Sequence, residues 1–412
     1  MGTDRLLTTD DVAMHLGVKK ATVYAYVSRG LLTSRRNGSG KESLFSEADV
    51  RAFAAQRRRG AATADATGPP AIHTGITLIT GESLYYRSFD ADTLARRESF
   101  ESVATLLWTG TLRHDPFPAD PQLTALAEAV TAPLPGSARL TDRLRVIVAA
   151  AGAADRLRFD TTPAAVVVTG RTILATMMSA LPERSSGDVP APGPYPFASA
   201  LWTRLSAGPP TPGRIAALNA ALVLLADHDL AASTYAARVA ASTRAHPYAV
   251  VSAGLAALDG PLHGAASGLV VELLTAALRS GDALGAVSER LRTGGVPGFG
   301  ISLYPDGDPR AATLLDLITR LDPADLVPDG RRALDTVLEV AATMSSRAGL
   351  KPNIDFALAA FTLLTDMPAD AGEAIFAVAR TAGWLAHAIE EYADQPSRFR
   401  PTGRYAGRPP HE

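Results

Sequence analysis

Residues 60–70 limit most strongly what this chain can fold into, because they divide it into two parts. The segment reads Gly-Ala-Ala-Thr-Ala-Asp-Ala-Thr-Gly-Pro-Pro and contains no large apolar side chain that a core could bury. We therefore interpret it as a linker. With 412 residues, the chain is longer than one folding unit usually needs. The sequence predicts a small N-terminal domain over residues 1–59 and a much larger body over residues 71–412.

The two parts carry opposite net charges. Residues 1–60 contain 11 Lys and Arg against 6 Asp and Glu, a net charge of +5. The remainder contains 29 against 36, a net charge of −7, which agrees with the −2 of the whole chain. A basic head on an acidic body indicates that only the head meets a polyanion such as nucleic acid.

Capping and turn signals predict the order of elements in the head. One of the two threonines at 8–9 can cap a first helix, which ends at Gly17. A second helix is expected over residues 19–28. Asn37-Gly38 is a tight-turn signal between two short strands, and Ser46 can cap a third helix. Helix, turn, helix, hairpin, helix is the order of a winged helix-turn-helix.

Four short motifs relate the head to a known class of domains. They are Thr9-Asp10-Asp11-Val12-Ala13, Leu16-Gly17-Val18, Ala21-Thr22-Val23-Tyr24 and Gly30-Leu31-Leu32. In these the head resembles the MerR-type and excisionase-type helix-turn-helix domains. The candidate DNA contacts are Lys19, Lys20, Thr22 and Tyr24 on the second helix and Arg35, Arg36 and Lys41 in the hairpin. The alternative is a small module for protein contacts. One head would bind DNA weakly, so DNA binding predicts a dimer with two heads.

From about residue 71 onward the pattern is mostly helical, which predicts a mainly α body. Residues 213–226 form a strongly apolar helix that is too short to span a membrane, so we expect it in the core or at a subunit contact. Residues 1–5 lack the apolar region of a signal peptide. The chain has no cysteine and no His, Asp and Glu cluster with metal-ligand spacing. We expect a cytoplasmic protein without membrane segment, disulfide or metal.

Three polar residues of the body lie at turns or helix starts. His228 directly follows the apolar helix, and His263 follows a Gly-Pro turn. Asp355 enters a predicted helix after Pro352. Each also has a purely structural interpretation, because a histidine can be a capping or core hydrogen-bond partner and an aspartate can be a helix cap.

Several motifs, taken in order, relate the body to one family. The main ones are Gly260-Pro261-Leu262-His263-Gly264, Pro297-Gly298-Phe299-Gly300 with Asp308-Pro309-Arg310, and Pro352-Asn353-Ile354-Asp355. Supporting matches are Tyr86-Arg87, His228 with Ser233-Thr234, and Arg380 with Gly383-Trp384, His387 and Arg400-Pro401. In these motifs the body resembles citrate synthase. The resemblance implies an all-helical large domain over residues 71–265 and 365–412 and a small closing domain over about 266–364.

The resemblance also implies a reaction between an acyl-CoA and oxaloacetate or a related 2-oxo acid. Asp355 matches the base that removes a proton from the acyl group, and His263 matches the donor that stabilises the resulting enol. The residues that match the dicarboxylate-binding groups are His228, Arg310, Arg380 and Arg400. By resemblance, Arg400 comes from the neighbouring subunit of a homodimer. No metal or bound cofactor is implied, since coenzyme A enters as part of the substrate.

One position departs from the family pattern. Ile301 stands where the resemblance implies a histidine that polarises the keto carbonyl, and isoleucine cannot donate a hydrogen bond. Losing one such donor typically costs on the order of 10²–10³ in rate. Three functions remain open. The protein is a condensing enzyme, a catalytically silent regulator that senses a di- or tricarboxylate or an acyl-CoA, or a structural subunit that forms hetero-oligomers with an active paralogue.

Overall fold

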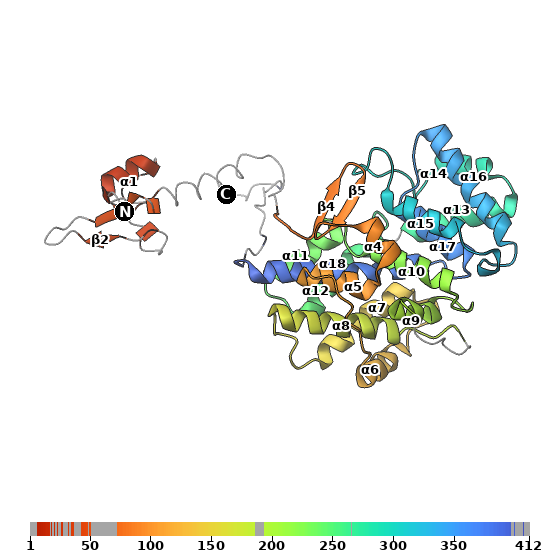
Figure 1. Cartoon of the computed structure of the whole chain (residues 1–412), viewed down its shortest axis with the longest axis horizontal. Helices are drawn as coiled ribbons and strands as arrows, with labels where there is room; N and C mark the ends of the chain where they lie inside the picture. The colour runs from red at the N-terminus through yellow and green to blue at the C-terminus, as the bar shows by residue number, and fades with distance from the viewer. Residues whose placement is uncertain are drawn as a thin grey trace. The chain divides into compact units, whose positions relative to one another are not determined.

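The computed structural model describes parts of residues 6–50, residues 72–185, 193–264 and 266–396, and the single residues 399 and 407. The chain divides into two compact units, Met1–His73 and Thr74–Glu412, whose elements are labelled in Figure 1. The predicted linker at residues 60–70 lies outside the described residues. In the described part of the chain, no helix is long and apolar enough to cross a membrane.

The N-terminal unit combines helix α1 (Thr9–Leu16) with a three-stranded sheet of order β1-β3-β2. The helix begins with a capping box, in which the Thr8 hydroxyl accepts from the Asp11 N–H at 3.2 Å and the Asp11 carboxylate accepts from the Thr8 N–H at 2.9 Å. Strands β2 (Arg35–Arg36) and β3 (Ser43–Ser46) form the predicted hairpin. Strand β1 (Leu6–Thr8), which no sequence signal indicated, pairs with β3. The core residues are Leu7, Val12, Ala13, Val23, Leu32, Phe45 and Val50.

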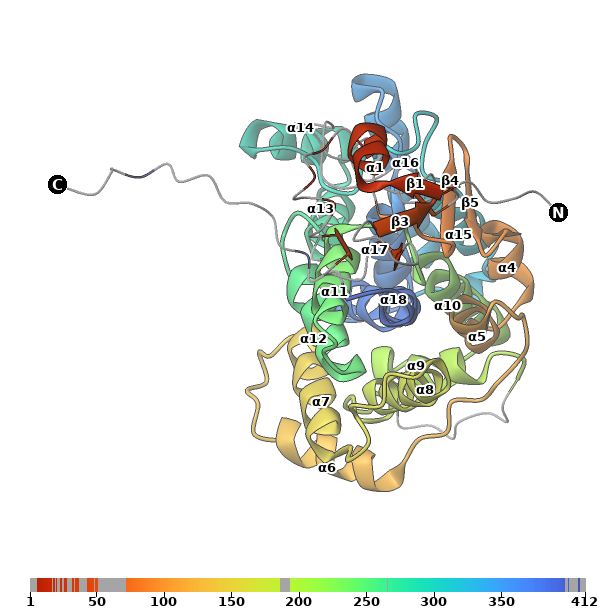
Figure 2. The same cartoon turned by 90° about the vertical axis from the view of Figure 1, so that its left-hand side faces the viewer.

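A long central helix, α18 (Ala371–Ala393), organises the body. Nearly all its residues are buried, and its many small side chains let other helices pack closely against it. The surrounding helices are α5 (Phe100–Thr109), α7 (Leu140–Ala154), α8 (Pro163–Ser179), α10 (Pro212–Leu225), α11 (Ala232–Ser242) and α12 (Pro247–Leu258). Figure 2 looks along α18 and shows this arrangement. Helix α10 is the predicted apolar helix, and its burial in the core confirms that prediction.

The loop after α10 lies directly against α18. The Gly383 N–H donates to the Ala226 carbonyl at 3.0 Å. A Cβ at Gly383 would collide with that carbonyl oxygen and with the side chain of Asp227, so only glycine permits this approach. The close contact fixes where the residues that follow α10, among them His228, enter the interior.

A small antiparallel sheet precedes the helices of the body. Strands β4 (Thr77–Thr80), β5 (Ser83–Tyr86) and β6 (Phe89–Asp90) are followed by helix α4 (Ala91–Arg97). The buried Tyr86 hydroxyl donates to the carbonyls of Leu224 at 3.1 Å and Asp227 at 2.9 Å, which joins the sheet to the end of α10. The mostly helical pattern did not indicate this sheet, because its strands are only two to four residues long.

A second hydrophobic core lies between residues 270 and 360. It is formed by helices α13 (Ala266–Ser280), α14 (Ala283–Thr293), α16 (Gly330–Ala348) and α17 (Ile354–Leu364). Helix α15 (Pro309–Thr319) packs on α17 and also on α4 and α10, so it bridges the two cores. The remaining elements are α6 (Pro121–Thr131), α9 (Pro196–Leu205) and the short η1 (Pro323–Asp325). The boundaries and the closing motion of the small domain stay predictions.

Candidate active site

Arg310, in the first turn of α15, is a fixed and buried cation. Its Nε donates to Asp308 Oδ1 at 2.9 Å and its Nη2 donates to Asp308 Oδ2 at 2.8 Å. Burial would lower the pKa of Arg310, but the Asp308 carboxylate outweighs burial and raises that pKa. Asp308 also accepts the Ile354 N–H at 3.0 Å, so one carboxylate joins the start of α15 to the start of α17.

Arg380 lies in the middle of α18 with only 1% of its surface exposed. Its Nε donates to the Leu225 carbonyl at 2.8 Å, and its guanidinium carbon lies 4.7 Å from the ring centre of Phe376. Nη1 and Nη2 are buried without a hydrogen-bond partner among the described residues. Burial, together with the charge of Arg310, lowers the pKa of Arg380 to about 10, so it stays a cation at neutral pH. Unpaired donors on a buried cation are suited to an anionic ligand.

His228 and Tyr304 form a buried pair, with His228 Nε2 lying 2.9 Å from the Tyr304 hydroxyl. Burial and the charges of Arg310 and Arg380 hold the pKa of His228 well below its usual range, so the imidazole is neutral. Burial raises the pKa of Tyr304 to about 12, so the phenol keeps its proton. Two neutral groups that can each donate or accept a hydrogen bond therefore lie beside the two arginines.

His263, in the turn before α13, is held in one tautomer. Its Nε2 lies 3.3 Å from the Ser233 N–H and 2.8 Å from the Ser233 hydroxyl. A backbone N–H can only donate, so Nε2 accepts and the ring proton lies on Nδ1. Trp384 Nε1 donates to the Ser233 hydroxyl at 3.2 Å, which directs the hydroxyl proton towards His263. Burial, with the charge of Arg380, lowers the pKa of His263 to about 4, which keeps this imidazole neutral as a donor through Nδ1.

Asp355 is not the cap of the helix that it enters. Asn353 caps α17, because its side-chain oxygen accepts the N–H groups of Asp355 at 3.0 Å and of Phe356 at 3.4 Å. The Asp355 carboxyl is therefore not used in capping, and its Oδ1 is buried without a hydrogen-bond partner among the described residues. Burial raises the pKa of this carboxyl to about 7, against the lowering effect of Arg310. A carboxyl group with this pKa can take up and release a proton near neutral pH.

The glycine-containing loop before Tyr304 is fastened to the start of α17. Gly298 and Gly300 have φ angles of +85° and +74°, a region in which glycine has little competition. The Asn353 N–H donates to the Gly298 carbonyl at 2.9 Å, and the Gly300 N–H donates to the Lys351 carbonyl at 2.9 Å. Ile301, the next residue, is half-buried and offers no side-chain donor. The loop therefore holds an apolar side chain close to the helix that carries Asp355.

The structure brings together the predicted site residues His228, His263, Arg310, Arg380 and Asp355, which come from five separate segments. The charge of Arg380 acts on His228, His263 and Asp355, and Arg380 in turn is affected by the charge of Arg310. Arg400 lies outside the described residues. Within the described ranges, no three His, Asp or Glu side chains are grouped so that they could hold a metal ion.

Four groups that shape the site had no predicted role: Ser233, Tyr304, Asp308 and Asp227 with its partner His387. The Asp308-Pro309 pair is a helix-start signal that could have indicated the cap, since aspartate is preferred there and proline follows at the first helical position. No local signal indicates the contact between Ser233 and His263, because 30 residues separate them.

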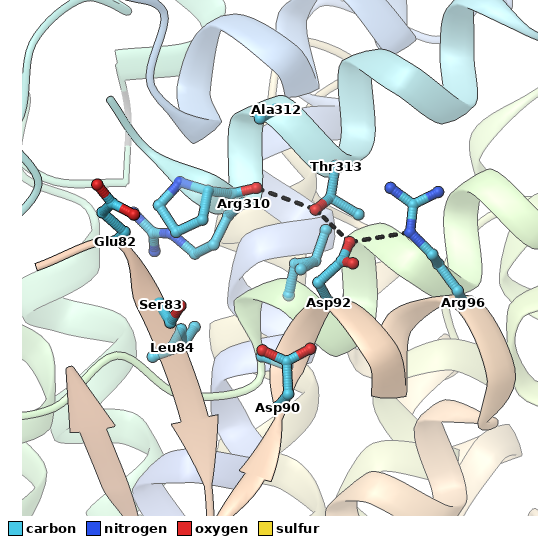
Figure 3. A pocket seen from close by; sticks show the side chains of 12 residues that line it. Glu82, Ser83, Leu84, Asp90, Asp92, Arg96, Arg310, Ala312 and Thr313 are labelled. Atoms are coloured by element: carbon cyan, nitrogen blue, oxygen red, sulfur yellow. Dashed lines mark hydrogen bonds and ion pairs between the residues drawn. The ribbon is translucent and has the colours of Figure 1, made fainter. Parts of the chain in front are cut away.

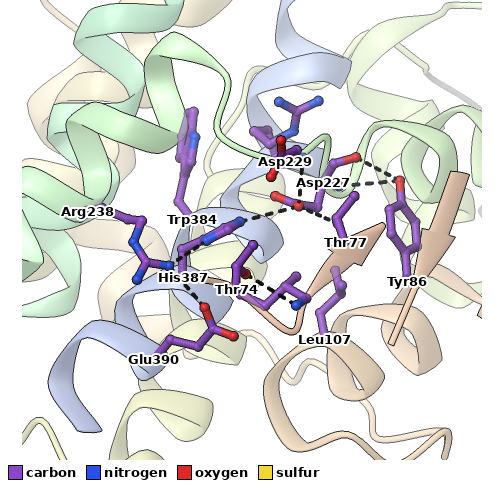
Figure 4. Close-up of polar contacts among 12 residues, drawn as sticks. Thr74, Thr77, Tyr86, Leu107, Asp227, Asp229, Arg238, Trp384, His387 and Glu390 are labelled. Carbon is purple, nitrogen blue, oxygen red and sulfur yellow. Dashed lines mark hydrogen bonds and ion pairs between the residues drawn. The ribbon is translucent and has the colours of Figure 1, made fainter. Parts of the chain in front are cut away.

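A buried charged network fixes the loop after α10, as Figure 4 shows. Asp227 Oδ2 accepts from the Thr77 hydroxyl at 2.5 Å and lies 3.4 Å from His387 Nε2. The Arg238 guanidinium can only donate, so His387 Nδ1, at 3.0 Å, accepts from it and the ring proton points to Asp227. Arg238 Nη2 also donates to Glu391 at 3.1 Å. The network ties β4, α11 and α18 together directly beneath the candidate site.

Replacing Arg238 by Gln should lower the free energy of unfolding by about 3–5 kcal/mol, because it breaks the buried ion pair between Arg238 and Glu391. The two side chains are only 5% and 4% exposed. Urea denaturation measures the change. Arg145→Gln is the matched control, because Arg145 pairs with Asp259 at 3.4 Å but is 45% exposed, so about 0–1 kcal/mol is expected. Equal losses in the two variants would contradict this account of the network.

A cavity of about 390 Å³ lies beside Arg310, between the β4–β5 hairpin, α4 and the start of α15. Figure 3 shows Asp92 at its wall, contacting both Thr313 and Arg96. The Thr313 hydroxyl donates to Asp92 Oδ1 at 2.6 Å, and Arg96 Nη1 donates to Asp316 at 2.9 Å. These bonds tie α15, which bridges the two cores, to α4 on the large core.

The DNA-contact candidates of the head are only partly described. Lys20 is exposed and forms an ion pair with Asp10 at 2.6 Å. Arg35 and Arg36 form strand β2. Lys19, Thr22, Tyr24 and Lys41 lie outside the described residues.

Comparison with known families decides the identity of the body. The model of the citrate synthase C-terminal domain matches residues 65–402. The chain belongs to the citrate synthase family. It is 30% identical to the citrate synthase of Mycolicibacterium smegmatis, over 84% of this chain and 98% of the relative. It is also 30% identical to the 2-methylcitrate synthase 2 of Corynebacterium glutamicum, over 82% of this chain and 93% of the relative.

Solved structures confirm the citrate synthase fold. The citrate synthase of Thermoplasma acidophilum, solved with carboxymethyl coenzyme A and oxaloacetate, matches with a TM-score of 0.69 over 83% of this chain and 95% of that chain, at 23% identity. The Thermotoga maritima enzyme matches with a TM-score of 0.66 at 24% identity, over 84% of this chain and 96% of that chain. The head is a separate match, because a helix-turn-helix domain model covers residues 6–58.

Proposed function

We propose that this citrate synthase family member condenses an acyl-CoA with oxaloacetate or a related 2-oxo dicarboxylic acid. The observation that carries the proposal is Asp355, whose buried Oδ1 has no hydrogen-bond partner among the described residues and whose carboxyl has a pKa of about 7. The proton next to a thioester is weakly acidic, so its removal requires a positioned base paired with a donor at the oxygen that gains charge. Asp355 and the His263 Nδ1–H provide such a pair.

In the proposed reaction, Asp355 takes a proton from the carbon next to the thioester carbonyl. His263 donates through Nδ1 to the thioester oxygen and stabilises the enol that forms. The enol carbon bonds to the keto carbon of the 2-oxo acid, whose oxygen takes up a proton. Water then cleaves the thioester and releases coenzyme A. The sequence of steps consumes one water and needs no metal or redox cofactor.

Arg310 and Arg380 bind the carboxylates of the 2-oxo acid in this proposal. Arg380 presents two buried nitrogens that have no partner in the described part of the chain, and guanidinium groups bind carboxylates through paired hydrogen bonds. Arg400 would supply a third cation from a neighbouring subunit. The relatives are a citrate synthase and a 2-methylcitrate synthase, which supports an acetyl or propionyl group as the acyl part.

Release of coenzyme A from acetyl-CoA and propionyl-CoA, with a panel of 2-oxo acids, tests the proposal. A thiol reagent can follow the reaction without background from the protein, because the chain contains no cysteine. Turnover with a dicarboxylic 2-oxo acid, and much less with pyruvate, is the expected result. If no member of the panel releases coenzyme A faster than buffer, the condensation proposal is wrong.

The pH dependence of kcat/KM should report the titration of Asp355. Its pKa is raised to about 7 and the base acts when ionised, so kcat/KM should fall about tenfold per pH unit below 7 and level off above it. Glu373 also has a pKa of about 7, raised by burial, and pairs with Arg139, but its charge also contributes to the raised pKa of Asp355. Glu373→Gln should therefore keep the pH dependence of kcat/KM, with a midpoint at or slightly below that of the wild type. Loss of the pH dependence in this control would show that Glu373, and not Asp355, is the group that titrates.

A cytoplasmic homodimer is part of the proposal, because the family resemblance implies that Arg400 would come from a second subunit. An exposed apolar patch between α7 and α8 supports it. Leu157 is 79% exposed, and Phe159 and Val168 are also largely exposed. The patch borders a groove of about 1060 Å³ that reaches Leu126 on α6. Exposed apolar surface of this kind commonly marks a protein interface.

Light scattering should give twice the chain mass, whereas a larger mixed complex with a paralogue would favour the hetero-oligomer.

A second candidate function is a DNA-binding regulator that uses the same ligand site as a sensor. The helix-turn-helix match over residues 6–58 and the apolar Ile301 favour it. Binding of labelled DNA, followed by fluorescence anisotropy, tests this function with and without oxaloacetate and acetyl-CoA. A ligand-dependent change in affinity would support a sensor, because a ligand shifts DNA binding only if it binds the two states differently.

A further inference from the structure

Attack of an enol on a keto carbon leaves negative charge on the keto oxygen, so a condensing site needs a hydrogen-bond donor at that oxygen. The loop 298–304 offers few candidates. Ile301 has no polar side-chain atom, and Ser302 is exposed rather than turned into the site. The side chain of Tyr304 is the polar group of this loop that is buried in the site, and its hydroxyl contacts His228.

The other donors of the site already have partners or tasks in the proposed reaction. His263 Nε2 is held by Ser233, which leaves only its Nδ1–H for the thioester oxygen. Arg310 is bound by Asp308 through two hydrogen bonds. Arg380 is suited to a carboxylate. Among these site residues, the pair of His228 and Tyr304 is therefore the candidate source of the donor to the keto oxygen.

This pair always has one proton to spare. The phenol and the neutral imidazole carry one exchangeable proton each, and the 2.9 Å contact between them uses only one of the two. If His228 Nε2–H donates to the phenol oxygen, the phenol proton is free to donate to a ligand. Burial and the charges of Arg310 and Arg380 keep His228 neutral, and burial keeps the proton on Tyr304, so the pair holds these two protons at neutral pH.

We propose that the Tyr304 hydroxyl donates to the keto oxygen of the bound 2-oxo acid and that His228 positions it by donating from Nε2 to the phenol oxygen. This inference rests on the proposed function. Tyr304 is well placed to act as a fixed donor, because both ends of its backbone are held. Its N–H donates to the Ile301 carbonyl at 3.4 Å, and its carbonyl accepts from the Gly307 N–H at 3.1 Å.

The test is the infrared stretching frequency of the keto group of bound oxaloacetate, labelled with carbon-13 at that carbon. A hydrogen bond to the keto oxygen weakens the C=O bond and lowers the frequency. The wild-type protein should lower it relative to free oxaloacetate. Tyr304→Phe should remove most of this shift while it changes the oxaloacetate affinity only about threefold, since the arginines remain, and coenzyme A release should fall about 10²–10³-fold.

Two further variants keep the test specific. Tyr392→Phe removes another partly buried hydroxyl, which donates to the Ala245 carbonyl away from the site, and should leave the frequency shift unchanged. Ile301→His in the Tyr304→Phe background should restore the shift, because it supplies a new donor from the same loop. Recovery of the shift also shows that the Tyr304→Phe site still folds.

The outcomes separate this inference from the proposed function. A shift that persists in Tyr304→Phe, or an unshifted carbonyl in the wild-type complex, would overturn the role of Tyr304. A shifted carbonyl in a wild-type protein that releases no coenzyme A would support the donor and refute the condensation. Failure of the wild-type protein to bind oxaloacetate would overturn both.

Discussion

Asp355→Asn should lower the rate of coenzyme A release about 10²–10⁴-fold, because it removes the proposed base but keeps the size of the side chain. Oxaloacetate affinity should stay close to that of the wild type, since the arginines are untouched. Asp366→Asn is the matched control: Asp366 lies just beyond the other end of α17, is exposed, and should have no effect on rate. A variant that keeps more than a tenth of the wild-type rate would show that Asp355 is not the base.

The same variant should be more stable than the wild type at high pH. The Asp355 pKa is raised from 3.8 to about 7 in the folded state, so the stability it contributes is present below the unfolded pKa and is lost as the pH rises to about 7. Asparagine does not ionise and avoids that loss. Above pH 7, urea denaturation should therefore give a higher free energy of unfolding for Asp355→Asn, by on the order of 2–4 kcal/mol. Equal free energies of unfolding for the two proteins at pH 8 would mean that burial does not raise the pKa of the Asp355 carboxyl.

Arg380→Gln should weaken dicarboxylate binding about 10²–10³-fold, the second large effect expected. It removes a buried cation whose two Nη donors have no partner among the residues that the structure describes, and each charge-assisted hydrogen bond to a carboxylate is worth about 1.5–3 kcal/mol. Calorimetric titration with oxaloacetate measures the change. Arg320→Gln is the control, since Arg320 is exposed and pairs with Asp316 four residues earlier on the surface. If the two variants bind oxaloacetate equally well, the anion site lies elsewhere.

Local sequence signals account for much of the fold and for the choice of site residues. The apolar run at residues 213–226 predicted α10 because a helix with no polar face must be buried. The Asn37-Gly38 signal predicted the strands of the head hairpin. The resemblance in ordered motifs predicted His228, His263, Arg310, Arg380 and Asp355 as site residues, and in the structure the charge of Arg380 interacts with the other four.

The features that the sequence could not predict depend on contacts between residues that lie far apart in the chain. From the sequence alone, Asp355 could have been the N-cap of its helix. In the structure Asn353 is the N-cap, and Oδ1 of the Asp355 carboxyl has no partner among the described residues. The tautomer of His263 depends on Ser233, which lies on α11, 30 residues earlier in the chain. The strands β4 to β6 are too short for an alternating pattern and are held by Tyr86, whose partners come more than 130 residues later.

Ile301 bears on whether the body is an enzyme or a ligand sensor for the helix-turn-helix head. An enzyme that lost one donor can use another, which is the role inferred for Tyr304, and the helix-turn-helix head is then an addition to a working catalyst. A sensor needs ligand binding but has no need for a base. The Asp355 carboxyl, whose buried Oδ1 has no partner among the described residues, is therefore the feature that separates the two functions. A buried carboxyl with a raised pKa lowers the stability of the folded protein above that pKa, and a protein that only binds its ligand gains nothing in return.

The most direct test of the central claim is exchange of the acetyl-CoA methyl protons with deuterium from heavy water, measured by mass spectrometry in the presence of malate. Malate fills the dicarboxylate site but has no keto group, so proton removal is observed without condensation. Exchange is expected in the wild type and in Tyr304→Phe, and none above background in Asp355→Asn. Wild-type exchange no faster than that of Asp355→Asn would contradict the claim that Asp355 removes the proton.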